Sequence, residues 1–238
     1  IPHLTTDLFA WEYNSNNVSL LPALVNTVYM AVISLAIAVP IGIGSAIYLV
    51  EYAGRGNKFV EVIRITAETL SGIPSIVYGL FGSLFFVKFM GLGLSMLSGA
   101  LTLSIMILPL IMRSSEEALL AVPMSYREGS FGLGAGKLRT VFQIVLPASI
   151  PGILSGVILA IGRIVGETAA LIYTSGTVAG LAGVMDSGRT LAIHMYVLSN
   201  EGLHKNEANA TAVILLLIVL GINAVSGKLA EKLEAPEA

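Results

Sequence analysis

Residues 21–50 read LPALVNTVYMAVISLAIAVPIGIGSAIYLV, and no side chain in this stretch carries a charge. The whole uncharged run, between Glu12 and Glu51, is 38 residues long. An α-helix rises about 1.5 Å per residue, so roughly 20 apolar residues are enough to cross the hydrocarbon core of a bilayer. Residues 24–50 are therefore predicted to form a membrane-spanning helix.

Four more uncharged runs of similar length follow. They lie between Glu68 and Lys88 (19 residues), Lys88 and Arg113 (24), Arg139 and Arg163 (23), and Glu207 and Lys228 (20). One such run could be a buried helix of a soluble protein, but the repetition of full-length runs argues against this. The sequence predicts an all-α fold, a polytopic membrane helix bundle, with further spans at about 70–89, 92–112, 150–173 and 210–229.

The composition agrees with a membrane protein. The chain has 238 residues, of which 55% are hydrophobic and 12% charged, and its mean hydropathy is +0.85. Soluble domains carry about 25% charged residues, because water covers their whole surface. The net charge of -2 does not indicate a nucleic-acid partner. The absence of cysteine excludes disulfides, thiolate metal sites and thiol catalysis.

The distribution of lysine and arginine predicts the orientation. If the first residues are external, nine basic residues fall in internal loops: Arg55, Lys58, Arg64, Arg113, Arg127, Lys137, Arg139, Lys228 and Lys232. Only Lys88, Arg189 and Lys205 fall outside, and Arg163 lies within a span. Cytoplasmic loops are enriched in basic residues. We therefore expect the N-terminal segment to lie outside the membrane and the C-terminus to be cytoplasmic.

The beginning of the chain does not by itself account for this orientation. Residues 1–20 are polar and aromatic, contain no targeting signal and start with Ile1. We expect a sixth, preceding helix to place this end outside. Residues 1–238 are predicted to form a single transmembrane domain, with a cytoplasmic loop at 113–140 and an external segment at 177–207. A short helix is expected within that segment, at Thr190–Leu198.

The loop at 113–140 does not resemble a plain linker. Pro123 is expected to end the preceding helix, and Ser125 and Glu128 have the spacing of a capping box, which predicts a new short helix. Phe131 and Leu133 give this helix apolar side chains. The glycines at positions 129, 132, 134 and 136 have no side chain, so another protein could approach the backbone closely there. Such a helix suits docking into another protein's groove, although it could also pack on its own bundle.

Arg163 and Glu167 are the most unusual residues of the predicted spans. They lie four residues apart, and Arg163 is about ten residues or more from either end of the predicted span. A charge at that depth normally faces a protein interior or a water-filled path. Two interpretations are open: a structural ion pair between these residues, or a site where the guanidinium of Arg163 attracts an oxyanion through two parallel hydrogen bonds.

The span that contains these charges also has two successive GxxxG pairs, Gly152/Gly156 and Gly162/Gly166. Small residues four apart allow helix backbones to approach closely. The sequence leaves open whether these glycines contact another subunit or another helix of this chain.

No catalytic or metal-binding pattern accompanies these features. The stretch 131–138 resembles a phosphate-binding loop only superficially, because Phe131 takes the place of the first glycine and Leu138 that of the required Ser or Thr. His3, His194 and His204 have no ligand partners at metal-binding spacing. We therefore expect no enzymatic activity and no bound cofactor in this chain.

The 113–140 loop and the start of the next span resemble the "EAA" loop of ABC importer permeases. The matching residues are Glu128-Gly129-Ser130, then Gly134 after three residues, then 144–147 (IVLP) after nine more. Gly129 and Ser130 replace the two usual alanines with other small residues. The resemblance implies that this loop docks on the ATP-hydrolysing subunit, through Ser125, Glu128, Gly129, Ser130, Phe131, Leu133 and Gly134.

Three further stretches, 21–27 (LPALVNT), 71–79 (SGIPSIVYG) and 163–170 (RIVGETAA), resemble the phosphate importer permeases, specifically the PstA-type subunit. The resemblance implies six spans and an inward phosphate path that includes Arg163, Glu167 and Thr168. Glu167 would accept a hydrogen bond from the P–OH group of phosphate, which sulfate lacks. The implied partners are a PstC-like permease, two PstB-like ATPase subunits, which would hold ATP and Mg, and an external PstS-like phosphate-binding protein.

Two other functions remain open at this point. The cargo could be another oxyanion, such as sulfate or molybdate. A secondary transporter or channel is the other alternative, although such a protein needs no docking loop and often contains inverted repeats.

Overall fold

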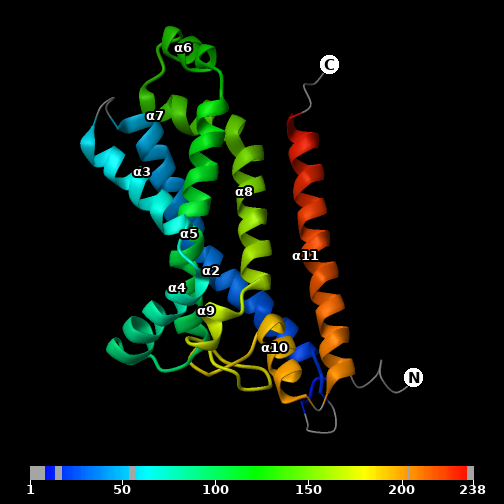
Figure 1. The fold of residues 1–238 in the computed structure, drawn as a ribbon. Helices are drawn as coiled ribbons and strands as arrows, with labels where there is room; N and C mark the ends of the chain where they lie inside the picture. The colour runs from blue at the N-terminus through cyan, green and yellow to red at the C-terminus, as the bar shows by residue number, and fades with distance from the viewer. Residues whose placement is uncertain (1–8, 14–17, 54–56, 203, 235–238) are drawn as a thin grey trace. The chain divides into compact units, whose positions relative to one another are not determined.

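The computed structural model describes residues 9–13, 18–53, 57–202 and 204–234, with side chains as far as Lys228. In this part of the chain all regular elements are helices. Four continuous helices are long and apolar enough to cross a membrane: Leu21–Tyr52, Met96–Ala121, Lys137–Gly166 and Lys205–Lys228 (Figure 1). The predicted all-α membrane helix bundle is confirmed.

Two of these four helices contain π-helical turns. The first consists of α2 (Leu21–Ile47) and η1 (Tyr48–Tyr52), and the second is α5 (Met96–Ala121). The third combines α7 (Lys137–Thr140), η3 (Val141–Val145) and α8 (Leu146–Gly166). The fourth is α11 (Lys205–Glu234). The third therefore begins and ends earlier than the predicted span at 150–173.

The predicted span at 70–89 belongs to a pair of helices with a sharp bend between them. α3 (Lys58–Ser71) ends before Pro74, and a new helix follows, formed by α4 (Ser75–Gly82) and η2 (Ser83–Phe89). The two helices meet at 103°. Proline lacks an N–H group and disfavours helical backbone in the preceding residue, so the break falls there. The predicted count of five spans is reached when this bent pair is taken as one span.

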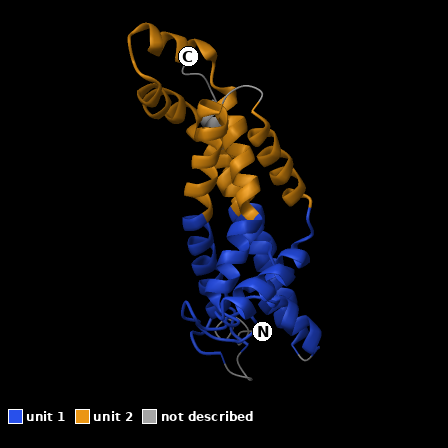
Figure 2. Ribbon diagram, turned by 90° about the vertical axis from the view of Figure 1, so that its left-hand side faces the viewer, with its two compact units in different colours: residues 1–37, 73–106, 161–221 blue, residues 38–72, 107–160, 222–238 orange. Residues whose placement is uncertain are grey.

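The contacts divide the chain into two compact units (Figure 2). Unit 1 comprises residues 1–37, 73–106 and 161–221, and unit 2 comprises residues 38–72, 107–160 and 222–238. Each of the four long helices contributes residues to both units. The single domain proposed over 1–238 stays a prediction.

In unit 1, α2 holds the loop that precedes α10 (Leu191–Glu201). The side-chain amide of Asn26 donates to the carbonyls of Gly180 (2.9 Å) and Arg189 (3.1 Å), and its oxygen accepts from the N–H of Ala182 (3.2 Å). Thr27 Oγ1 accepts from the N–H of Leu191 at 2.8 Å. These buried and part-buried bonds satisfy polar backbone groups of the loop. The short helix predicted at 190–198 is confirmed.

Unit 1 also brings α4 against α9 (Ala169–Ile172) at backbone distance. A Cβ added to Gly79 would lie 2.8 Å from Cα of Ala170 and 3.1 Å from the carbonyl oxygen of Ala169. Only glycine allows this approach. The glycine of the 71–79 motif therefore positions the segment that follows Arg163.

Unit 2 is organised around an apolar cluster that joins η1, α3, α5 and η3. Its buried members include Leu49, Val60, Leu119, Val141 and Val145. α8 packs closely on α5, because a Cβ added to Gly152 would lie 2.7 Å from Cβ of Ala118, and one added to Gly156 would overlap the side chain of Ser114.

Candidate functional site

The predicted docking loop contains a separate short helix, α6 (Met124–Gly132), directly after Pro123. Its existence and its start after the proline agree with the sequence analysis. The predicted capping box is wrong: Pro123 is the N-cap, and no side chain caps the helix. Ser125 is the second helical residue, so its hydroxyl is beyond the position from which a capping bond is made.

α6 and the turn after it expose apolar side chains. Leu133 is 91% exposed and Phe131 46% exposed, and Met124 and Tyr126 are exposed as well. Of the residues predicted to dock, Ser125, Glu128, Gly129, Phe131, Leu133 and Gly134 are exposed. Ser130 is buried, and its hydroxyl lies 2.8 Å from that of Thr140 in α7. Ser130 therefore packs inside the chain and cannot belong to the exposed surface.

Gly134 has a backbone requirement of its own. Its φ is +81°, and a Cβ built on it would have open space around it. A side chain there would be strained even in the absence of a partner. Exposed neighbours such as Leu133 are better positions for testing docking.

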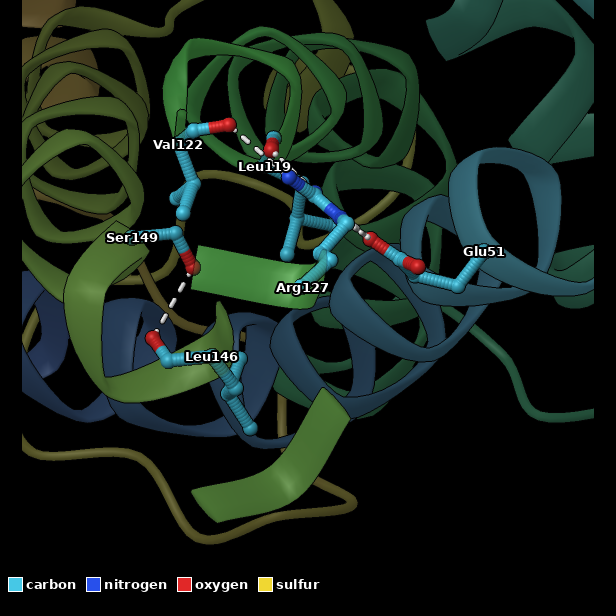
Figure 3. Close-up of polar contacts among 6 residues, drawn as sticks. All are labelled: Glu51, Leu119, Val122, Arg127, Leu146 and Ser149. Carbon is cyan, nitrogen blue, oxygen red and sulfur yellow. Dashed lines mark hydrogen bonds and ion pairs between the residues drawn. The ribbon is translucent and has the colours of Figure 1, made fainter. Parts of the chain in front are cut away.

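The buried side chain of Arg127 connects α6 to Glu51, Leu119 and Val122 (Figure 3). Its Nε and Nη2 donate to Oε1 of Glu51 at 3.1 and 2.7 Å. Its Nη1 donates to the carbonyl of Val122 at 2.8 Å, and Nη2 also donates to the carbonyl of Leu119 at 2.9 Å. The sequence analysis missed this pair, because 76 residues separate Arg127 from Glu51.

The segment of Arg163 and Glu167 differs from its prediction. α8 ends at Gly166, so Arg163 lies in the last turn of the helix, and the predicted distance of about ten residues from either end is wrong. Glu167 is buried, and its Oε1 accepts from the N–H of Ala170 at 3.0 Å. Among the described residues, no acidic side chain forms an ion pair with Arg163.

The helix break explains why the ion pair is absent. Side chains four apart meet only while the helix continues. Thr168 has φ -122° and ψ -51° and is the N-cap of α9, so the chain turns between Arg163 and Ala170. Tyr78, buried in α4, lies within electrostatic range of Arg163. The sequence analysis did not identify Tyr78 as a neighbour of this site.

The two predicted glycine pairs have different surroundings. Gly152 and Gly156 pack on α5 of the same chain, which is one of the alternatives left open. Gly166 is exposed, and a Cβ there would contact nothing within 4 Å. Gly162 is partly buried.

Two of the three histidines, His194 and His204, lie in the described part of the chain. In the described part of the chain, no three residues from His, Asp and Glu are placed to hold a metal, and His3 lies outside that part. His204 Nδ1 is 3.9 Å from Glu207 Oε2. His194 is fully buried in α10 without a hydrogen-bond partner in that part of the structure. Burial, with a smaller contribution from the positive charge of Arg189, lowers the pKa of His194 to about 3.

Known proteins show similarity to most of the chain. The permease YqgI of Bacillus subtilis, a probable ABC transporter permease protein, is 35% identical over 84% of this chain and 74% of its own length. The phosphate transport system permease protein PstA of Haemophilus influenzae is 33% identical over 94% and 80%. PstA 1 of Mycobacterium tuberculosis H37Rv is 41% identical over 65% of this chain, and the match spans about half of PstA 1 (49%).

Solved structures agree on the fold. A chain of the MetNI methionine ABC transporter in an inward-facing conformation superposes with a TM-score of 0.68 at 19% identity, over 91% of this chain and 94% of the other. A chain of a bacterial alginate ABC transporter gives 0.64 at 14%, over 97% and 87%. The family described as "Binding-protein-dependent transport system inner membrane component" matches residues 38–235. The chain belongs to this family and is a membrane permease of the ABC importer class.

Proposed function

We propose that this chain is a transmembrane subunit of an ATP-driven importer that carries inorganic phosphate inward. Support for the cargo comes from the relatives in Haemophilus influenzae and Mycobacterium tuberculosis, which are named phosphate transport system permease proteins. The observation that carries the ATP-driven part is the exposed apolar surface of α6 and the turn after it, formed by Met124, Tyr126, Phe131 and Leu133. A groove of another subunit would cover such a surface.

The proposed partners follow from this arrangement. Two PstB-like subunits bind and hydrolyse ATP with Mg, and one of them receives α6. A PstC-like permease completes the membrane pathway, and a PstS-like protein delivers phosphate from outside. The proposed orientation in a bacterial inner membrane places 113–140 and the C-terminus in the cytoplasm and 177–207 outside, as the basic residues indicate.

Arg163, Glu167 and Thr168 are proposed to meet the anion. Arg163 has no acidic partner among the described residues, so its guanidinium can donate to phosphate oxygens. Oε1 of Glu167 is engaged by the N–H of Ala170, while Oε2 is bonded to no described residue. Oε2 can therefore accept a hydrogen bond from the P–OH group of phosphate. The same carboxylate would repel sulfate.

The mechanism combines these two regions. Closure of the ATPase subunits displaces α6, and the helices then open the Arg163 segment alternately to the two sides of the membrane. The arginine offsets the desolvation of the anion during its passage, which otherwise carries a penalty of several kcal/mol.

Uptake of labelled phosphate into proteoliposomes tests the proposal. The reconstituted complex should accumulate phosphate only with ATP and the external binding protein, and excess sulfate or molybdate should compete weakly. Strong competition by either anion would identify a different oxyanion as the cargo. ATP-independent uptake would instead favour a secondary transporter or channel.

A further inference from the structure

Arg127 and Ser130 are the buried residues of α6, and of these only Arg127 is charged. Its neighbours Tyr126 and Glu128 are exposed, whereas Arg127 is 8% exposed. The side chains of Arg127 and Glu51 are 10% and 9% exposed in their ion pair. By contrast, the Arg113–Glu117 pair on α5 is 61% and 67% exposed. The Arg127 pair is therefore shielded from the solvent screening that weakens surface pairs.

The guanidinium joins α6 to the ends of two long helices. Glu51 belongs to η1, the π-helical end of the first long helix. Leu119 lies in the last turn of α5, and Val122 follows directly after that helix. The last carbonyls of a helix have no partner within it, and here Arg127 supplies donors to two of them.

The other polar links of this region are weaker. Ser130 and Thr140 share one hydroxyl–hydroxyl bond at 2.8 Å. Lys137 Nζ lies 5.2 Å from the centre of the Tyr52 ring, a cation–π contact. Charge-assisted bonds are roughly twice as strong as neutral ones, and the planar guanidinium fixes direction as well as distance. Arg127 is thus the most directional polar connection between α6 and the long helices.

We propose that the Arg127–Glu51 pair is the positioning element that transmits displacement of α6 to the ends of η1 and α5. This inference rests on the proposed function and adds to it how the docking helix is connected. A subunit that pushes on the exposed side of α6 would move the two helix ends with it, because four hydrogen bonds hold Arg127 to them. Arg127 acts through these contacts and does not touch the transported ion.

The test measures phosphate uptake per ATP hydrolysed in the reconstituted complex. Arg127→Met with Glu51→Gln removes both charges, so neither is left buried alone. ATPase assembly and hydrolysis should persist, while uptake per ATP should fall about tenfold or more, within the usual range of coupling between sites. An unchanged ratio would overturn the proposal.

The matched control is Arg113→Met with Glu117→Gln, the same substitutions in the exposed pair on α5. This control should keep the wild-type ratio, and an equal fall in it would also overturn the proposal. If the Arg127 double variant does not assemble, Arg127→Lys keeps the positive charge but loses the planar arrangement of donors. A wild-type ratio in an assembled Arg127→Lys complex would count against the proposal equally.

A second readout does not depend on phosphate. The chain has no native cysteine, so spin labels at Gly132→Cys and Tyr48→Cys, both exposed positions outside the proposed docking residues, report the distance between α6 and η1. With Arg127 and Glu51 intact, ATP binding to the complex should leave this distance unchanged, because both elements move together. In the double variant ATP should shift or broaden it, and an unchanged distribution would refute the connection. A wild-type complex that transports no phosphate would refute only the proposed function.

Discussion

Two arginine–glutamate combinations in this chain behave in opposite ways. Arg163 and Glu167 are four residues apart and form no ion pair, whereas Arg127 and Glu51 are 76 residues apart and form a buried one. Glu167 instead accepts from the backbone N–H of Ala170. Spacing along a helix brings charges together only while the helix continues, and here α8 ends between the two residues.

The two arginines also differ in what their hydrogen-bond donors can do. Arg127 has its donors engaged by a carboxylate and two carbonyls, which suits a fixed connection. Arg163 is partly exposed and has no described acidic partner, which agrees with its proposed role in binding the anion. An arginine whose N–H donors are engaged within the protein connects parts of the fold. An arginine with donors left over can bind a ligand.

The largest expected effect comes from Arg127→Met alone. This substitution leaves the carboxylate of Glu51 buried and uncompensated and deprives two carbonyls of their donors. Breaking a buried pair in this way costs about 3–5 kcal/mol of stability. Thermal unfolding of the complex purified in detergent should show a clear loss.

Adding Glu51→Gln to Arg127→Met should recover much of that loss, because no charge then remains buried. Arg113→Met, which breaks the exposed pair, should change stability by less than about 1 kcal/mol. If Arg127→Met is as stable as wild type, the Arg127 pair is not the rigid connection described above.

The next effect concerns transport through Arg163. Arg163→Met should leave stability within about 0.5 kcal/mol, because no ion pair is lost. Phosphate uptake should slow, since charge-assisted hydrogen bonds to the anion contribute about 1.5–3 kcal/mol, which corresponds to a slowing of about ten- to hundredfold. Initial rates of labelled phosphate uptake measure this directly.

Lys88→Met is the matched control for Arg163→Met, because Lys88 is an exposed basic residue of the same compact unit. It should transport phosphate normally. Near wild-type uptake by folded Arg163→Met would remove Arg163 from the anion path.

His194 offers a third kind of buried basic group, one that avoids charge altogether. Its pKa in the folded protein is about 3, against about 6.5 in an unfolded chain. Above pH 6.5 the residue is neutral in both states and has no effect. Between pH 6.5 and 3 only the unfolded chain binds the proton, so stability falls as the pH falls. At pH 5 the loss should be about 2 kcal/mol.

Unfolding temperatures at pH 7.5 and pH 5 test the His194 prediction. His194→Phe removes the titrating group at a position where neither ring nitrogen has a hydrogen bond to the described residues. The acid-dependent loss should shrink in this variant and persist in His204→Gln. An identical pH dependence in wild type and His194→Phe would show that another group causes it.

The sequence predicted what bilayer thickness and proline dictate. Hydrocarbon thickness requires long uncharged helices, so the spans could be located, and Pro123 correctly marked the boundary between α5 and α6. The bend before Pro74 was missed, because a proline inside an apolar run is compatible with either a kinked or a broken span. The tertiary environment decides between these outcomes.

The site was only partly predictable for a related reason. The exposed apolar residues of α6 follow from local composition, but the Arg127–Glu51 pair depends on long-range packing that no local pattern reveals. The end of α8 at Gly166 was missed, because the sequence stays largely apolar as far as Tyr173 and contains no proline there. Glu167 then found a backbone partner in place of Arg163.

The smallest expected effect is the energetic coupling between Arg163 and Glu167. A double-mutant cycle with Arg163→Met and Glu167→Gln should give additive stability changes, within about 0.5 kcal/mol, because the two side chains share no described contact. Glutamine keeps an oxygen that can accept from the N–H of Ala170, so Glu167→Gln alone should cost little. The same cycle on Arg127 and Glu51 should give a coupling of about 1–3 kcal/mol. Equal coupling in the two pairs would contradict the proposed difference between them. Arg163 would then neutralise Glu167, as Arg127 neutralises Glu51, and would not be free to bind the anion.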